Sequence, residues 1–473
     1  EDTAGPAGRA AAIVGAGPAG LTSAIMLAQQ GWSQVDVFDE LPAPPPPSDP
    51  AWGVGNRSYQ LGLNGRGQKA LSLLGCMERV DRYSALVRGR LTFDKEGTPV
   101  EKLLKPPGTP GAEKNYVTRV LQRDRLQACL LEEVAERYPQ IRVRHSVQCE
   151  GLELSGDQPA LQLRGPDGGA FDHGPVDLVV GADGVRSAVR DALVEAPDSR
   201  TGFTKFPDNN ERRYKTFLMH PDSVPGTRSD LNWGTGNSTL QLSMDALPTK
   251  EGEMVGVMLF KPGTEVYQRI EDLADANDAR RLFGDALPQL LPYLGERELA
   301  RFAARPIGRL PSFHTVEGDI HRQLPRGGVV LLGDSIKAVK PYFGQGCNSA
   351  LEDVSVLRKC LEEADSFAGE AAALFSRRRG EDARALVRIS RGFDRPGRLG
   401  TLRFVLPLVL DSLLHKALPR FFDPPLLRAL QDERNSFAEL ERRKLRERCA
   451  QLLLCAAGVA LTRRCILALI GIS

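Results

Sequence analysis

A glycine-rich stretch near the start of the chain has residue types and spacing that suit dinucleotide binding. Residues 13–20 read Ile-Val-Gly-Ala-Gly-Pro-Ala-Gly, and an acidic pair closes the next apolar segment. In such a stretch the first glycine permits a tight turn, the second lets the backbone approach a pyrophosphate and the third allows close helix packing. The start of the following helix favours negative charge, and a carboxylate on the next strand can accept from a ribose hydroxyl. A glycine turn that serves packing alone is the alternative. The predicted contacts are Gly15, Ala16, Gly17, Pro18, Ala19, Gly20, Asp39 and Glu40.

Two later strand ends also combine a carboxylate with glycine. The run 177–190 delivers Asp183-Gly184 to a turn, and the run 329–357 ends a strand at Gly333-Asp334 before a glycine-rich loop and a helix. A carboxylate can hold a ribityl hydroxyl, and a helix start can hold electron-rich flavin atoms. Each motif alone could be an ordinary turn.

The three motifs in this order resemble the FAD-dependent aromatic hydroxylases, the group A flavoprotein monooxygenases, over about residues 10 to 395. Within that family the similarity is greatest to the kynurenine 3-monooxygenases. It lies in Arg57-Ser58, 64–74, Gly89-Arg90, 123–126, 341–346 and 414–419. The resemblance implies an α/β fold: a Rossmann-like FAD-binding domain, an inserted antiparallel-sheet substrate domain and a helical C-terminal region.

The resemblance also implies roles for individual residues. Arg90 would bind a substrate carboxylate through its planar guanidinium. In the family a tyrosine six residues before Arg123 assists this arginine; here Val117 occupies that position, so we assign the role to its neighbour, Tyr116. A solvated surface arginine is the alternative for each arginine. The chemistry would centre on the flavin, so no side chain is assigned as catalytic and no metal site is expected. The further cofactor contacts that it implies are Arg57, Gly62, Arg123, Asp183, Gly184, Asp334, Pro341, Gly344, Gln345, Gly346, Cys347 and Asn348.

The sequence departs from the family in two more places. The family's Asn-Tyr-x-Glu-Met-Arg run has no match at 391–396, and Lys337 stands where the family has histidine. We interpret the missing run as the loss of a polar substrate contact and the lysine as altered specificity rather than lost activity.

The implied reaction uses NAD(P)H, preferably NADPH, and oxygen to hydroxylate a small, kynurenine-like aromatic compound through a flavin C4a-hydroperoxide. No second dinucleotide fingerprint occurs in the sequence, so the nicotinamide nucleotide should bind transiently as a co-substrate. Two alternatives remain open because a fold does not fix its chemistry. One is a flavoenzyme that epoxidises or reduces an isoprenoid or other apolar substrate. The other is a non-catalytic FAD-binding subunit or partner of a membrane complex.

The elements that position these residues follow from hydrophobic periodicity. Strands are expected at 11–14, 35–39, 176–180, 239–244, 254–260 and 328–332, and helices from 18 to 30 and over 64–74, 123–138 and 347–362. Residues 91–118 look irregular, and the pattern is helical after 370. A chain of 473 residues is too long to fold around a single hydrophobic core, so we expect several domains. The expected division is 10–199 and 316–370 for the FAD-binding domain, 200–315 for the substrate domain, 371–448 for a helical region and 449–473 for an apolar tail.

Composition and charge indicate the partners and the cellular compartment of the protein. The formal charge of +2 gives no net field for nucleic acid, and the eight cysteines form no C-x-x-C pair, which favours free thiols in a reducing compartment. Basic residues between 442 and 448 precede an apolar segment, which predicts membrane attachment of the tail. No secretory signal is recognisable, so we expect an intracellular protein associated with a membrane in an organelle, a mitochondrion or plastid.

Overall fold

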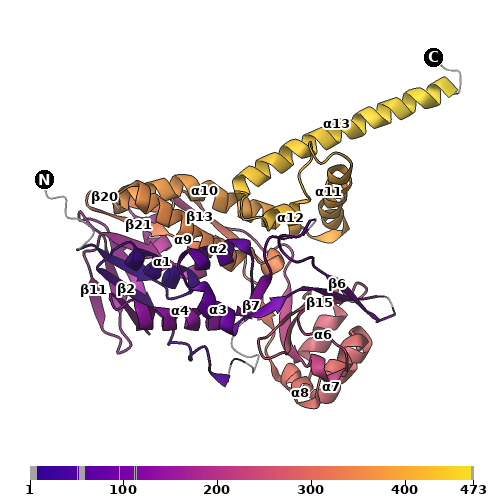
Figure 1. Ribbon diagram of the computed structural model, residues 1–473, viewed down its shortest axis with the longest axis horizontal. Helices are drawn as coiled ribbons and strands as arrows, with labels where there is room; N and C mark the ends of the chain where they lie inside the picture. Colours follow the sequence, from indigo (N-terminus) through magenta and orange to yellow (C-terminus); the bar gives the residue numbers. More distant parts are fainter. Residues whose placement is uncertain are drawn as a thin grey trace. The chain divides into compact units, whose positions relative to one another are not determined.

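The computed structural model describes residues 8–50, 52, 59–94, 96–110, 112, 114–365 and 367–469, with backbone only at 398, 401 and 454–469. The chain divides into two compact units, one up to Gly380 and one from Glu381. Figure 1 draws the second unit in orange to yellow.

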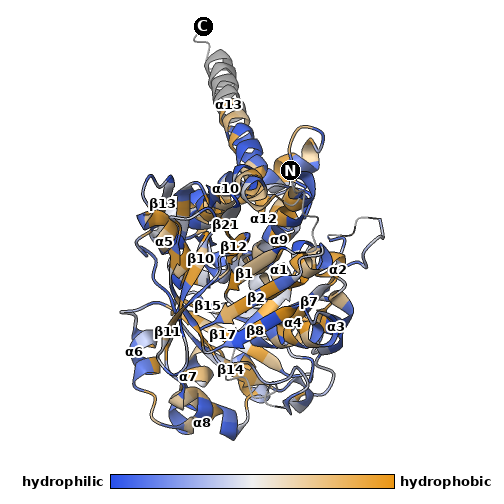
Figure 2. Cartoon of the chain, turned by 90° about the vertical axis from the view of Figure 1, so that its left-hand side faces the viewer, coloured by the Kyte–Doolittle hydropathy of each residue, from blue (hydrophilic) through white to orange (hydrophobic). Residues whose placement is uncertain are grey.

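The first unit contains a six-stranded sheet in the order β20-β21-β12-β1-β2-β8. All neighbouring pairs are parallel except β20 with β21. The strands are β1 (Ala10–Val14), β2 (Gln34–Asp39), β8 (Ile141–His145), β12 (Leu178–Gly181), β20 (His321–Leu324) and β21 (Gly327–Leu331). The central strands are almost wholly apolar and buried, as expected when helices cover both faces of a parallel sheet, and Figure 2 colours them largely as hydrophobic.

Helices surround this sheet and set the turns that follow its strands. Among them, α1 contacts both α4 and α9, and α2 also packs on α9. The helices of this part are α1 (Pro18–Gln29), α2 (Gly65–Leu73), α3 (Met77–Tyr83), α4 (Arg123–Arg137), α5 (Ala188–Glu195), α9 (Gln345–Glu363) and α10 (Ala368–Phe393). The division between the two units falls within α10.

Three small sheets complete the surroundings of the six-stranded sheet. They are β3 (Gln60–Leu63), β7 (Thr118–Gln122) and β4 (Ala85–Val87); β11 (Ala170–His173), β10 (Ala160–Arg164) and β9 (Gln148–Glu153); and β13 (Thr201–Lys205), β19 (His314–Gly318) and β22 (Lys337–Ala338), each in spatial order.

A seven-stranded sheet forms the other large part of the first unit. Its strands, in spatial order, are β18 (Gly308–Arg309), β14 (Arg213–Met219), β17 (Met254–Phe260), β16 (Leu242–Pro248), β15 (Asn232–Asn237), β5 (Gly89–Phe93) and β6 (Pro99–Leu103). One face packs against α6 (Glu265–Glu271), α7 (Ala276–Ala286) and α8 (Glu296–Ala304), which lie together in Figure 1. Phe217, Phe283 and Phe302 fill that core with edge-to-face or tilted ring contacts, an arrangement that aromatic rings prefer. Trp233 packs edge-to-face on Tyr293 in the same core.

The predicted fold class is confirmed, but two local predictions are wrong. Residues 91–118 are irregular only in part, because β5 and β6 join the seven-stranded sheet beside β15, whereas the described residues of 104–117 form no strand or helix. Every residue of β6 is exposed, so the sequence carries no apolar alternation that could reveal the strand. The strand expected at 239–244 is β16, which begins later, at Leu242.

The second unit is helical and includes the end of α10, α11 (Gly397–Ala417), α12 (Leu426–Leu430) and α13 (Phe437–Leu469). Asp411 is fully buried and binds Arg448 at 2.7 Å and Lys444 at 3.4 Å. The carboxylate of Asp382 accepts from the Ser436 hydroxyl and the Ala438 N–H, which fixes the start of α13. Among the described residues, none of the helices has the length and apolar character needed to cross a membrane.

Candidate functional site

The three predicted motifs lie at one edge of the six-stranded sheet. Because β21, β12, β1 and β2 are adjacent and parallel, Leu331 pairs with Gly181, Gly181 with Val14, and Val14 with Phe38. The turns that follow these strands therefore leave the sheet side by side. They contain Gly15–Gly20, Asp183–Gly184 and Gly333–Asp334. This edge is where ligands bind in open parallel sheets.

The turn between β1 and α1 requires glycine for steric reasons. Gly15 has a φ of 99°, and a Cβ there would overlap the carbonyl oxygen of Ala182. A Cβ at Gly20 would overlap the carbonyl oxygen of Gly15, so α1 can approach β1 only without a side chain at this position. A Cβ at Gly17 would meet the guanidinium of Arg123 at 3.4 Å. The structure thus places Arg123 beside the glycine turn.

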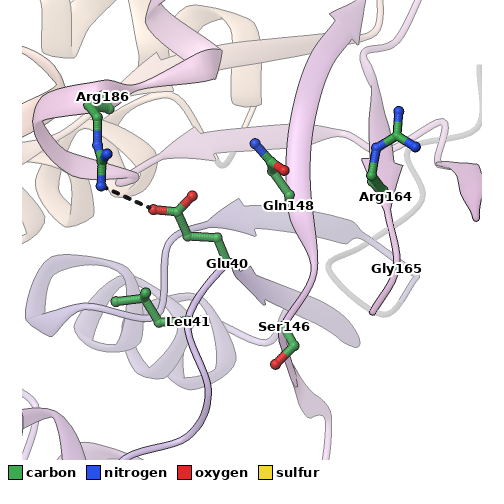
Figure 3. A pocket seen from close by; sticks show the side chains of 7 residues that line it. All are labelled: Glu40, Leu41, Ser146, Gln148, Arg164, Gly165 and Arg186. Carbon is green, nitrogen blue, oxygen red and sulfur yellow. Dashed lines mark ion pairs between the residues drawn. The ribbon is translucent and has the colours of Figure 1, made fainter. Parts of the chain in front are cut away.

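Asp39 and Glu40, the acidic pair at the end of β2, point in different directions and have different partners. Asp39 accepts from the N–H of Ala16 at 2.6 Å and from that of Leu41 at 2.8 Å, so its carboxylate joins β2 to the glycine turn. Carboxylate oxygens have further lone pairs with which to accept from a ribose. Glu40 instead points toward Arg186, at 3.9 Å (Figure 3). Both are exposed, so this ion pair adds little stability.

Glu40 and Arg186 line a cavity of about 390 Å³ beside the dinucleotide turn. Side chains from β9 and β10 complete its wall, and Figure 3 shows them around the opening. Its lining residues are Glu40, Leu41, Ser146, Gln148, Arg164, Gly165 and Arg186.

The turn after β12 holds a carboxylate with an unused oxygen. Asp183 accepts from the N–H of Val189 through Oδ2, whereas its buried Oδ1 has no hydrogen-bond partner among the described residues. Both side-chain polar atoms of Gln60, on β3, are also buried without a partner there. Burial raises the pKa of Asp183. Unmatched buried polar groups cost free energy, and bound FAD offers hydroxyl donors and ring acceptors that could match them, so these residues fit the cofactor.

Five side chains around the turn after β21 interact electrostatically. Burial raises the pKa of Asp334, against the opposing effects of Lys337 and Arg123. Burial, and then the Asp334 carboxylate, raise the pKa of Tyr59, and burial raises the pKa of Cys347 to about 12. Tyr59 is 52% exposed and the Arg123 side chain 37%, so both remain accessible.

The start of α9 is open on one side and tied down on the other. Gly344 adopts a left-handed φ of 60°, and a Cβ at Gly346 would meet no atom within 4 Å. Asn348 is buried: its amide donates to the carbonyl oxygens of Gly62 at 2.8 Å and Gly344 at 2.6 Å. It also accepts from the N–H of Asn64 at 2.9 Å. Its side chain therefore joins β3 and α2 to α9 and positions the loop.

A buried ion cluster under the Gly333–Asp334 turn was missed from the sequence. Asp353 is fully buried and accepts from the Nζ of Lys337 at 2.8 Å, from the N–H of Gly333 at 2.9 Å and from the guanidinium of Arg379. Arg379 and Arg66 both bind Glu352. Lys337 is thus part of the frame that holds the turn, and its effect on specificity stays a prediction.

His314 is a second support that the motifs did not reveal. Its Nε2 lies 2.8 Å from the carbonyl oxygen of Asp334, and burial lowers the pKa of His314 to about 4. The ring is therefore neutral at physiological pH and can donate through Nε2. It comes from β19, which pairs with β22 across a large sequence separation, so no local pattern indicates it.

The residues predicted to bind substrate lie on different elements. Arg90, on β5, donates to the carboxylate of Asp245 on β16 at 3.1 Å, and both side chains are more than half exposed. Tyr116 lies before β7, with the ammonium of Lys114 5.4 Å from its ring centre. Arg57 lies outside the described residues.

Comparison with known proteins identifies the family. A scan against protein-family models finds no match. A kynurenine 3-monooxygenase of Salinispora arenicola is 30% identical over 418 residues, which cover 87% of this chain and 86% of that protein. The chain belongs to the kynurenine 3-monooxygenase family. Family members from Stenotrophomonas maltophilia and Sus scrofa are 29% and 25% identical, over 88% and 87% of this chain and 86% and 82% of theirs.

Several solved structures share the fold of this member of the kynurenine 3-monooxygenase family. A 2-methyl-3-hydroxypyridine-5-carboxylic acid oxygenase is 20% identical with a TM-score of 0.61 and covers 90% of this chain and 98% of its own. PqsL, a probable FAD-dependent monooxygenase from Pseudomonas aeruginosa, is 19% identical with a TM-score of 0.57, over 82% and 95%. The chain is an FAD-dependent, NAD(P)H-using aromatic hydroxylase, and the isoprenoid and non-catalytic alternatives are not favoured.

Proposed function

We propose that the protein hydroxylates kynurenine or a close aromatic relative, with NADPH as the preferred reductant. Three turns at one edge of the parallel sheet carry the proposal, because they leave neighbouring strands side by side, where one FAD could contact all of them. The name of the relatives supports the substrate. Bound FAD, reduced by NADPH, supplies the oxygen-activating chemistry.

The residues of this chain would divide the work of holding the cofactor. Gly15–Gly20 and Asp39 would hold the adenosine half, as the steric need for glycine at Gly15 and Gly20 supports. Asp334 would hold the ribityl chain, with its backbone fixed by His314 and Asp353. The residues proposed to line the flavin are Gly62, Arg123, Pro341, Gly344, Gln345, Gly346, Cys347 and Asn348.

The second task is to bind the substrate and keep water from the reacting atoms, since water lets activated oxygen decay without product. Arg90 would bind the substrate carboxylate, because a guanidinium can donate two parallel hydrogen bonds to it. Its exposure on the open face of the seven-stranded sheet supports this role. Tyr116 would be its neighbour in the complex.

An anaerobic titration of the FAD-loaded protein with NADPH tests this function. L-Kynurenine should accelerate bleaching of the flavin absorbance, and in air the mixture should yield a product heavier by one oxygen atom. Benzoate, which lacks the amino-acid side chain, is the control and should do neither. Bleaching that is equally slow with and without L-kynurenine would contradict the proposed substrate.

We also propose that the C-terminal segment attaches the protein to an organelle membrane, mitochondrial or plastid. Leu445, Leu452 and Leu453 on α13 are exposed and apolar, which supports the idea. The basic run contributes less than its sequence suggested, because Arg443, Lys444 and Arg448 form ion pairs within the unit. Flotation with anionic vesicles should carry the full chain and leave a variant lacking 449–473 behind; equal flotation of the two would refute attachment by this segment.

A further inference from the structure

Arg90 and Asp245 share the face of the seven-stranded sheet that is opposite its aromatic core. Leu91 and Met244, their neighbours in sequence, are buried in the core against α6–α8. Because side chains alternate along a strand, Arg90 and Asp245 must point to the other face. Both remain more than half exposed there, at 53% and 58% of their side-chain areas.

The backbone between these two residues is shaped for their contact. β15 separates β5 from β16, and Gly234 on β15 is the register partner of Asp245. A Cβ at Gly234 would overlap the guanidinium of Arg90. The absence of a side chain therefore lets Arg90 cross β15 and donate to the Oδ1 of Asp245 at 3.1 Å.

A third polar group adjoins the pair. Asn232 is the register partner of Arg90 on β15, and its buried Oδ1 has no hydrogen-bond partner among the described residues. The face thus offers one donor cation, one exposed carboxylate and one unused acceptor.

These charges favour a particular head group on the substrate. An aromatic carboxylate with no positive charge would bring its anion to Arg90 but also close to Asp245, and like charges repel. An α-amino acid avoids this conflict, because its carboxylate can bind Arg90 while its ammonium group donates to Asp245 and Asn232. We propose that Asp245, with Asn232, determines specificity by selecting zwitterionic aromatic amino acids over simple aromatic carboxylates. The inference rests on the proposed function, since it places the substrate carboxylate at Arg90.

Matched pairs of ligands test this assignment in the FAD-loaded protein. L-Kynurenine is compared with 3-(2-aminobenzoyl)propionate, which lacks only the α-amino group, and L-tryptophan with indole-3-propionate. Dissociation constants come from ligand-induced changes in the flavin spectrum without NADPH, so turnover is not needed. The wild type should bind the amino acid of a pair at least about tenfold more tightly, as a charge-assisted hydrogen bond allows.

Asp245→Asn keeps the side-chain shape and removes the negative charge. It should weaken L-kynurenine binding about tenfold or more, strengthen binding of the desamino acid and so abolish or reverse the preference. Asp245→Glu retains the negative charge and should therefore keep the preference for the amino acid. It provides a second test of the charge if Asp245→Asn folds poorly. Asp285→Asn, an exposed aspartate on α7, is the matched control and should leave both constants unchanged.

The outcomes separate the two proposals. If the wild type prefers L-kynurenine and Asp245→Asn leaves the preference intact, the role of Asp245 is wrong and the proposed function stands. If L-tryptophan but not L-kynurenine shows the Asp245-dependent preference, the head-group rule holds and kynurenine is not the substrate. If the wild type favours the desamino acids or binds none of the four compounds, the inference is overturned.

Discussion

Two groups of charged side chains in the first unit differ in how their charges are compensated. Under the Gly333–Asp334 turn, Lys337, Asp353 and Arg379 are at most 4% exposed and bind one another and the backbone. On the open face of the seven-stranded sheet, Arg90 and Asp245 make one contact and keep more than half of their area in water. Charges that the protein satisfies fully act as a frame, whereas charges that it satisfies partly remain available to a ligand.

Of the substitutions that test this difference, Asp353→Asn should lower the free energy of unfolding most. It would leave the buried Lys337 without its ion-pair partner and Arg379 with Glu352 alone, and removal of one partner of a buried ion pair costs about 3–5 kcal/mol. We expect the free energy of unfolding in urea to fall by that amount and FAD to dissociate at lower urea. The exposed control Asp285→Asn should lose less than about 1 kcal/mol. Similar losses in both variants would mean that burial does not distinguish the cluster.

Acid should weaken the same frame through His314. Its pKa is about 4 in the folded protein and near 6.5 when unfolded, so between these values the unfolded state binds the extra proton. Stability is therefore complete above about pH 6.5 and falls as the pH drops toward 4, by about 3 kcal/mol from this residue. Unfolding free energies of the wild type and His314→Asn, measured across that range, should converge as the pH falls. A constant difference would contradict the role of the neutral ring.

Gly20→Ala tests the close approach of α1 to β1. The new Cβ would overlap the carbonyl oxygen of Gly15, so the helix must shift, at a cost of about 1–3 kcal/mol. FAD affinity should fall with it, because the helix start moves. Gly284→Ala, in α7, is the matched control: its Cβ would meet only a Leu291 methyl at 3.7 Å. Fluorescence titration with FAD measures both, and unchanged affinity in Gly20→Ala would show that the turn does not need glycine there.

Arg90→Ala should have the smallest effect on stability and a selective effect on ligands. An exposed ion pair contributes at most about 1 kcal/mol, so the melting temperature should hardly change. Binding of L-kynurenine, followed by the flavin spectrum, should be lost while FAD binding stays normal. A large drop in melting temperature would place Arg90 with the structural charges instead.

The sequence revealed the dinucleotide turn because local geometry permits only certain residues there. Gly15 needs a positive φ and Gly20 must lack a Cβ, so the motif records backbone constraints directly. The supports behind the turn left no such record: Asp353, Arg379 and His314 reach it from distant elements through side-chain contacts. Asp245 was missed for a similar reason, since only the register of β5, β15 and β16 places it beside Arg90.

The central claim is that three adjacent strand ends hold a single FAD. Titration of the apoprotein with FAD, followed by flavin fluorescence, tests it most directly. The titration compares the wild type with three single variants, one for each turn: Gly20→Ala, Asp183→Ala and Asp334→Ala. The wild type should bind one FAD per chain, and each variant should bind it more weakly at the same stoichiometry. A wild-type protein that binds no FAD, or a variant in any one turn with unchanged affinity, would contradict the claim.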